Sequence, residues 1–296
     1  MKLLRGMVLA LALGCGAALL RWPEAARQAV QEGLALAVDS VLPSLFPFFV
    51  LSSLLPALGL SDALGRLLEP LMGTLFHLGG AGTGALALGL VGGYPTGGRA
   101  VSELYSRRLC SREEAERLLA FCNNCGPAFF LSYLGAERFG SVLAGARLYL
   151  IHVLAALLTG ILLRPRRRPP LSRRPAAAET PLPLAFTGAV QSGLSAFLSV
   201  AAFVILFAVL LRPVKQIFGG SALLGLMELF TGAAALGGGG RDFVLAAVLT
   251  GFGGLSVHAQ TTAFFLPAGL SGRWYLRGKA LHAALSGALA ALSLLL

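Results

Sequence analysis

The chain alternates between apolar runs and short polar connections. The apolar runs cover residues 3–20, 34–60, 63–78, 81–91, 126–136, 140–163, 184–211, 221–236, 242–254, 257–270 and 274–296. A helix needs about 20 apolar residues to cross a hydrocarbon core of ~30 Å, so several runs are long enough to span a membrane and others are too short. The short runs that end at glycine or proline lie near 81–91, 126–136, 242–254 and 257–270. Because non-helical backbone at membrane depth must be satisfied by protein or water, the pattern predicts an all-α polytopic membrane protein with broken or re-entrant helices.

Composition supports the same class. Of 296 residues, 56% are hydrophobic and 12% are charged, and the mean hydropathy is +0.78. A soluble domain of this length needs more charge to cover its surface. The net charge of +11 lies between apolar segments, so it indicates orientation in a lipid bilayer and not binding of nucleic acid.

A run of arginine and proline divides the chain. Six arginines lie between positions 164 and 175, and short loops rich in arginine stay on the cytoplasmic side of a membrane. We therefore expect a first transmembrane half (1–163), a cytoplasmic linker (164–183) and a second transmembrane half (184–296). The N-terminal run resembles a signal peptide, but the many apolar segments after it favour an uncleaved first spanning helix.

The two halves are weakly alike. Val91-Gly92-Gly93-Tyr94 corresponds to Phe252-Gly253-Gly254-Leu255 at an offset of 161 (253 minus 92), whereas Arg147 corresponds to Arg277 at an offset of 130 (277 minus 147). The difference predicts an insertion in the first half, at about 101–146. It contains a charged stretch in which Ser111 and Glu114 form a capping box that starts a helix.

The first candidate site is the glycine-rich segment from Gly92 to Arg99. A helix that begins there presents backbone N–H groups to an anion, and the Arg99 guanidinium suits a carboxylate. The alternative is a tight turn between helices, with Arg99 reaching the membrane interface. The candidate binding residues are Tyr94, Thr96, Gly97, Gly98 and Arg99.

Two further polar groups lie next to glycines. Asn123 and Asn124 precede Gly126-Pro127, where their amides either bind a polar ligand or cap a helix break. Ser256 and Gln260 follow a second pair of glycines and would complete the polar shell. We expect 92–99 and 253–260 to meet near the bilayer midplane, beside the two asparagines.

Ionisable groups in apolar surroundings are candidates for ion coupling. Glu228 and His258 are such candidates, although we favour a simple hydrogen-bonded role for His258. Glu69 is expected at the membrane interface. Cys122 and Cys125 have C-x-x-C spacing without further metal ligands, which indicates apolar packing and no metal site. No catalytic or P-loop motif is present, so we expect neither an enzyme nor a cofactor, and transport that is secondary or facilitated.

Six motifs in order resemble a known family. They are Leu45-Phe46-Pro47-Phe48-Phe49-Val50, Leu68-Glu69-Pro70-Leu71-Met72, Gly93-Tyr94-Pro95, Glu114-Ala115-Glu116-Arg117-Leu118, Phe121-Cys122-Asn123-Asn124, and Gly254-Leu255-Ser256-Val257 followed by Ala259-Gln260. The sequence is similar to the YlbJ-type sporulation integral membrane proteins, which carry the nucleoside-recognition Gate domain. The resemblance implies a distant kinship with concentrative nucleoside transporters and a role in endospore formation, in which dipicolinate moves from the mother cell across the outer forespore membrane.

The expected function is therefore transport of a small anionic metabolite, first of all dipicolinate, through a lipid bilayer. The expected mechanism is alternating access between the two halves, whether their repeats are inverted or parallel. A transporter of nucleosides or other small metabolites is the first alternative, and a structural or assembly protein of the spore envelope is the second. The sequence predicts no nucleic-acid partner and leaves a homo-oligomer open.

Overall fold

The computed structural model describes residues 2–165, 181–218 and 221–295, so most of the predicted linker 164–183, including its arginines from 166 onward, lies outside the described residues. All regular structure in this part of the chain is helical. The elements are α1 (Lys2–Arg21), α2 (Pro23–Ala35), η1 (Leu36–Val41), α3 (Leu42–Ala57), α4 (Leu60–Leu71), η2 (Met72–Phe76), α5 (Gly82–Gly92), α6 (Thr96–Ser106), α7 (Arg112–Leu119), η3 (Phe129–Arg138), α8 (Val142–Leu162), α9 (Leu182–Phe218), α10 (Ser221–Met227), α11 (Leu229–Ala234), α12 (Gly240–Phe252), α13 (Gly254–Phe265) and α14 (Arg273–Ser293), with the η segments π-helical.

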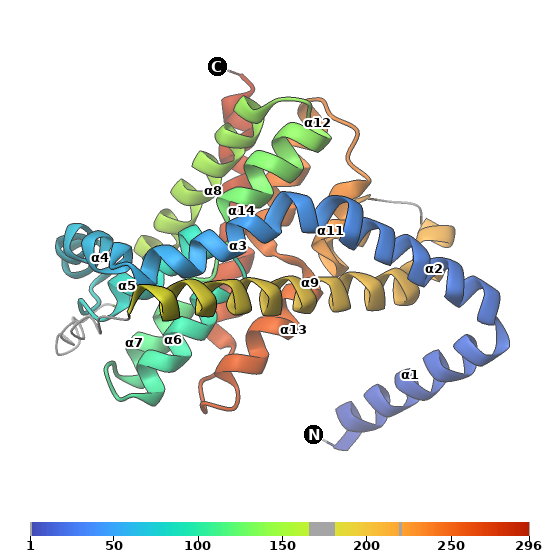
Figure 1. Cartoon of the computed structure of the whole chain (residues 1–296), viewed down its shortest axis with the longest axis horizontal. Coiled ribbons are helices and arrows are strands. Elements are labelled where there is room, and N and C mark those ends of the chain that lie inside the picture. Colours follow the sequence, from blue (N-terminus) through green and yellow to red (C-terminus); the bar gives the residue numbers. More distant parts are fainter. Residues whose placement is uncertain (1, 166–180, 219–220, 296) are drawn as a thin grey trace.

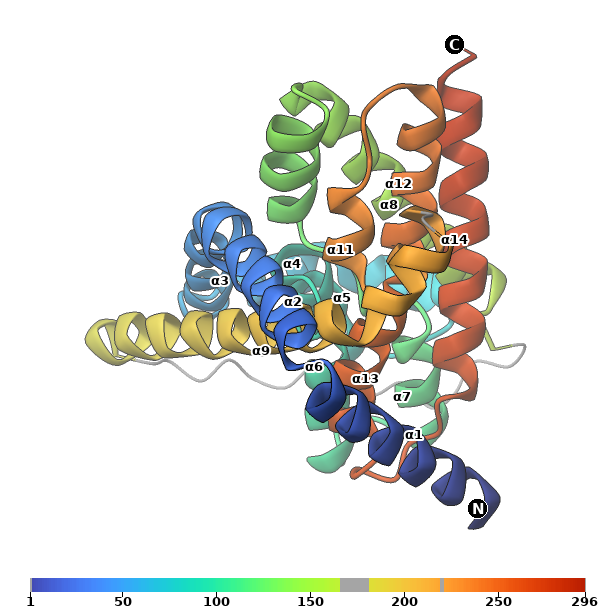
Figure 2. The same ribbon diagram turned by 90° about the vertical axis from the view of Figure 1, so that its right-hand side faces the viewer.

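Four segments within the described residues are long and apolar enough to cross a membrane. They are Pro23–Ala57, Val142–Leu162, Leu182–Arg212 and Gly240–Phe265. The prediction of an all-α polytopic membrane protein is therefore confirmed. The expected first spanning helix forms α1, which lies apart from the body of the protein (Figure 2).

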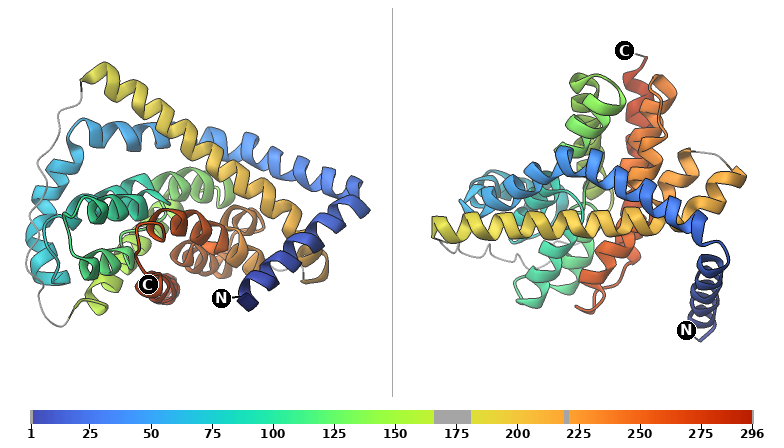
Figure 3. Two further views of the ribbon diagram at one scale, coloured as in Figure 1. Left: turned by 90° about the horizontal axis from the view of Figure 1, so that it is seen from below. Right: turned by 45° about the vertical axis from the view of Figure 1, so that its right-hand side comes forward.

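The longest helices form a pair on one side of the body. The continuous segment Pro23–Ala57 (α2, η1 and α3) packs along α9, and Figures 1 and 3 show this pair lying across the other helices. Glycines allow the close approach: a Cβ at Gly33 would lie 2.8 Å from Ile205 Cα, and one at Gly193 would lie 2.7 Å from Val50 Cγ2. Small residues serve the same purpose where membrane helices touch.

The remaining helices form an inner bundle of mostly half-length pieces. In Figure 2, α8, α11 and α12 lie toward one end of the protein, α6, α7 and α13 lie toward the other, and α14 runs along the full height. The half-length helices are separated by four breaks, at 93–95, 120–128, 228 and 253. The predicted interruptions at glycine and proline are thus confirmed, and the breaks are the irregular backbone that the protein interior must satisfy.

The charged stretch after Cys110 folds as predicted. Ser111 caps α7 by accepting a hydrogen bond from Glu114 N at 3.2 Å, while the Glu114 carboxylate accepts one from Ser111 N at 2.9 Å. Arg117 then stacks on Trp274, with its guanidinium carbon 3.4 Å from the ring centre, and donates to Leu163 O. These contacts fix α7 against α14 and the end of α8.

Candidate functional site at the meeting of four helix breaks

The hairpin formed by α5, α6 and the break between them is in close contact with residues 121–127. Gly93 has a φ of 76°, which favours glycine, and it is followed by the cis peptide Tyr94-Pro95. A Cβ at Gly89 would lie 1.6 Å from Cys122 O, and one at Gly97 would lie 1.9 Å from the same oxygen. Glycine on both arms of this hairpin is what lets residues 121–127 lie this close to it.

The two asparagines of that segment hold the breaks together. Asn123 Oδ1 accepts from Gly98 N at 3.2 Å, and Asn123 Nδ2 donates to Thr261 Oγ1 at 2.9 Å. Asn124 Nδ2 donates to Phe121 O at 2.8 Å. Both side chains are fully buried. Asn123 therefore ties α6 to α13, and Asn124 caps its own break.

The break between α12 and α13 lies against the first one. Gly253 and Gly254 have φ values of 95° and 76°. Tyr94 donates to Thr250 O at 2.8 Å, and a Cβ at Gly253 would lie 3.2 Å from the Tyr94 hydroxyl oxygen. The structure thus brings the two glycine-rich segments together through the Tyr94 side chain.

The break at residue 228, between α10 and α11, is capped by an acidic side chain. The buried Glu228 carboxylate accepts hydrogen bonds from Phe230 N at 3.1 Å and Thr231 N at 2.6 Å, at the start of α11. Ser256 Oγ donates to the same carboxylate at 3.4 Å. A carboxylate at a helix N-terminus is stabilised by the amides and by the helix dipole, so Glu228 has a structural role here.

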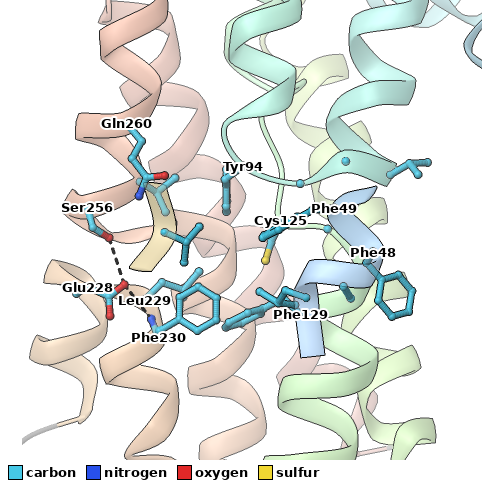
Figure 4. A pocket seen from close by; sticks show the side chains of 18 residues that line it. Phe48, Phe49, Tyr94, Cys125, Phe129, Glu228, Leu229, Phe230, Ser256 and Gln260 are labelled. Atoms are coloured by element: carbon cyan, nitrogen blue, oxygen red, sulfur yellow. Dashed lines mark hydrogen bonds between the residues drawn. The ribbon is translucent and has the colours of Figure 1, made fainter. Parts of the chain in front are cut away.

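A small cavity of about 50 Å³ lies where these breaks meet. Figure 4 shows Glu228, Ser256 and Gln260 along one side and aromatic rings across the rest. The lining side chains with rings are Phe48, Phe49, Tyr94, Phe129 and Phe230. Ligand sites for small molecules are commonly about 300–1,000 Å³, so this cavity must widen to hold a metabolite.

The predicted binding residues divide into three groups. Tyr94, Ser256 and Gln260 line the cavity, as does the coupling candidate Glu228. Asn123 and Asn124 are buried in the hydrogen bonds described above. The third group comprises Thr96, Gly97, Gly98 and Arg99, which belong to the first turn of α6 and are not among the lining residues.

The expectation that Arg99 meets Ser256 and Gln260 is wrong in this structure. Helix α6 buries Gly97, Gly98, Val101 and Ser102, and Arg99 lies on the opposite, exposed face. The expected anion site at the helix start is also occupied, because Gly98 N donates to Asn123 and Arg99 N donates to Pro95 O. His258 has the role that we favoured, since its Nδ1 pairs with the Tyr275 hydroxyl at 2.8 Å.

Sequence reasoning missed the cation that does lie at the centre. Lys279 of α14 is 0% exposed, and its Nζ donates to Asn123 O and, at 3.4 Å, to the Tyr94 hydroxyl. The same Nζ lies 5.1 Å from the centre of the Tyr94 ring. None of the ion pairs found in the described ranges involves Lys279. The Lys279 side chain thus places an ionisable amine directly behind the Tyr94 side of the cavity.

Comparisons with known proteins agree with this architecture. Residues 38–162 match the Gate family, described as nucleoside recognition, and this match contains the breaks at 93–95 and 120–128. The chain is 31% identical over 233 residues to the sporulation integral membrane protein YlbJ of Bacillus subtilis, covering 72% of this chain and 56% of that protein. The chain therefore spans little more than half of this relative. No solved structure matches it significantly.

Proposed function

Because this chain belongs to the Gate nucleoside-recognition family over residues 38–162 and is related to the sporulation integral membrane protein YlbJ, we propose that it is a transporter of a small planar aromatic anion during sporulation. Dipicolinate is the first candidate, carried across the outer forespore membrane by secondary or facilitated transport. In this proposal the chain is not an enzyme, and its arginine-rich linker faces the cytoplasm.

The observation that carries the proposal is the aromatic cavity at the meeting of four helix breaks. Transporters place substrate sites at discontinuous helices near the bilayer midplane, where backbone groups and helix ends become available. The rings of Phe49, Phe129 and Phe230 offer flat apolar surfaces to an aromatic ligand. A structural protein of the spore envelope has no need for such irregular backbone within its core.

Lys279 takes the role that the sequence suggested for Arg99. A buried ammonium without an acidic partner is costly unless it is hydrogen-bonded or balanced by a counter-charge. Two opposite unit charges about 8 Å apart attract by about 2 kcal/mol at an effective dielectric constant near 20. A ligand carboxylate in the cavity beside Tyr94 supplies this counter-charge to Lys279.

The arrangement also supports inverted repeats. Helices α8 and α14 run antiparallel, because Arg147 near the start of α8 donates to Ser293 O at the end of α14, and His282 contacts His152 O midway. In order, α5–α6, α7–η3 and α8 have counterparts in α10–α11, α12–α13 and α14. We infer that one offset near 130 residues relates the two halves, so that position 123 corresponds to position 253. With a single offset, no insertion at 101–146 is needed to align the halves.

Alternating access follows from these repeats in our proposal. The cavity measures only about 50 Å³, and the half-length helices beside it lie toward opposite ends of the bundle. Movement of one set of half-helices relative to the other opens the cavity to one side at a time. The long pair formed by Pro23–Ala57 and α9 would provide the fixed frame.

Nucleoside transport is the second candidate. The Gate description favours it, and so does the side of the cavity formed by Glu228, Ser256 and Gln260, which offers hydrogen-bonding groups to a neutral base. A neutral nucleoside has no carboxylate for Lys279 to attract. The two candidate substrates therefore differ in whether their transport depends on the charge of Lys279.

Uptake by purified protein in liposomes separates the candidates. We expect labelled dipicolinate to enter, uptake to fall at least about tenfold (~1.4 kcal/mol) in Lys279→Met, and Arg99→Gln, the matched change of an exposed cation, to behave as wild type. Uptake of labelled uridine but not of dipicolinate would establish the second candidate. Transport of neither, by protein that remains monodisperse in detergent, would refute a transport function.

A further inference from the structure

One face of helix α14 carries a buried polar stripe. Its members are Tyr275, Lys279, His282 and Ser286, each 0% exposed. Their spacings of four, three and four residues place them on a single helical face. At 1.5 Å per residue, the stripe extends over about 16 Å, which is roughly half the thickness of a hydrocarbon core. Polar and ionisable residues in such positions are rare in membrane proteins and mark ion or proton paths.

The hydrogen bonds around the stripe define which ring nitrogen carries the proton in two histidines, His152 and His282. His152 Nε2 accepts from Cys125 N at 3.1 Å, so its proton lies on Nδ1. His282 Nε2 contacts the carbonyl oxygen of His152 at 3.0 Å and must donate, which leaves its Nδ1 as a free acceptor. The two rings lie 4.3 Å apart between centres. A neutral donor and a neutral acceptor therefore face the interior next to Lys279.

Several polar atoms along the stripe have no protein partner. Among the described residues, eight buried side-chain nitrogen and oxygen atoms lack a hydrogen bond. Five of these belong to the stripe, to its contacts His152 and His258, or to the neighbouring amide: His152 Nδ1, His282 Nδ1, Ser286 Oγ, His258 Nε2 and Asn124 Oδ1. Buried polar atoms are nearly always paired, so such a concentration is unusual and calls for a function.

We propose that this stripe conducts protons and that Lys279 couples them to transport. The inference rests on the proposed function and names the coupling ion. The Lys279 amine takes up one proton from the side where the anion enters, which gives the ammonium that balances a ligand carboxylate. After the anion leaves, the ammonium releases this proton toward His282 on the opposite side. One proton therefore travels with each anion, and Lys279 returns to its starting state.

The surroundings of Lys279 suit a group that gains and loses a proton. The titratable groups that face it are Tyr94, Tyr275, Cys122, Cys125, His152, His258 and His282, from α13, α14, α8 and the breaks at 93–95 and 120–128. No carboxylate is among them, so nothing in this set fixes the lysine permanently as a cation. The anionic ligand is then the group that decides its charge.

Substrate-driven proton movement tests the inference. Liposomes that contain wild-type protein and an internal pH dye are supplied with external dipicolinate, and we expect the lumen to acidify as the anion enters. In His282→Gln the amide still donates to His152 O but cannot carry a proton, so acidification should slow at least about tenfold (~1.4 kcal/mol in the barrier). Exchange of labelled for unlabelled dipicolinate should continue, because the substrate contacts remain. His77→Gln, a histidine outside the stripe, is the matched control and should acidify as wild type does.

Each outcome decides a separate point. Exchange of dipicolinate by the wild type without any change in lumen pH overturns proton coupling and leaves the proposed function intact. Acidification by His282→Gln at the wild-type rate overturns the path through His282. Absence of exchange in the wild type refutes dipicolinate transport itself. Unchanged melting temperatures of the variants establish that a loss of coupling is not a loss of fold.

Discussion

Replacing Gly97 by alanine tests whether the close contact between the α5–α6 hairpin and residues 121–127 determines stability. Gly97 is buried at the start of α6, and its added Cβ would lie 1.9 Å from Cys122 O and 2.7 Å from Cys122 C. Real Cβ atoms essentially never come within 3.0 Å of another heavy atom, so the two backbones would have to separate by at least 1.1 Å (3.0 minus 1.9).

The expected cost comes from backbone that has little room to move. Overpacking a well-packed interior costs about 1–3 kcal/mol, occasionally more, and a clash with main-chain atoms belongs at the upper end. The same displacement lengthens the 3.2 Å bond from Gly98 N to Asn123 Oδ1, which contributes about 1 kcal/mol more. We expect Gly97→Ala to be destabilised by about 3–4 kcal/mol.

The assay is thermal melting of the purified protein in detergent, with Gly84→Ala as the matched control. Gly84 lies on the other arm of the hairpin, in α5, and an added Cβ there has no heavy atom within 4 Å. Alanine in place of glycine within a helix gains about 1 kcal/mol, so the control should melt at or above the wild-type temperature. Equal melting temperatures of Gly97→Ala and wild type would show that Gly97 does not lie as close to Cys122 O as described.

Two further changes probe single hydrogen-bonded caps. Ser111→Ala removes the side-chain cap of α7 and should lower stability by about 1 kcal/mol in the same melting assay, whereas Ser111→Asp, which keeps an acceptor, should not; equal melting of the two variants contradicts the capping role. Glu228→Ala leaves Phe230 N and Thr231 N without their acceptor, which costs about 1–3 kcal/mol, and Glu228→Gln, which keeps one acceptor oxygen, should lose less. A Glu228→Ala protein that melts with the wild type would mean that the break before α11 is satisfied in another way.

The positions of the helix breaks could be predicted because glycine and proline leave a local signal. The segments 92–99, 123–127 and 253–260 were predicted as interruptions from the positions of glycine and proline, and all three contain or adjoin breaks in the structure. The capping box at Ser111 is equally local. Local rules suffice where the physical cause, a missing Cβ or a missing N–H, belongs to the residue itself.

The charge at the centre could not be predicted by the same reasoning. Arg99 stands next to the glycines in sequence, but the direction of its side chain depends on which face of α6 packs against α13. Lys279 is far from every break in sequence and reaches Asn123 O only through the packing of α14. One signal was present, because Tyr275, Lys279, His282 and Ser286 repeat at helical spacing in an apolar run, and such a polar face must be buried against protein.

The close contact of residues 121–127 with both α5 and α6 limits which parts of the protein can shift independently. Cys122 O lies against Gly89 and Gly97, and Gly126 lies against Gly93, so the hairpin and this segment have no room to slide past each other. Helices α5 and α6 must therefore travel together with the chain that joins α7 to η3, as one mechanical unit. Any hinge that admits a solute therefore lies outside these contacts, for example where Leu78 to Ala81 lead into α5 or where Gly140-Ser141 join η3 to α8.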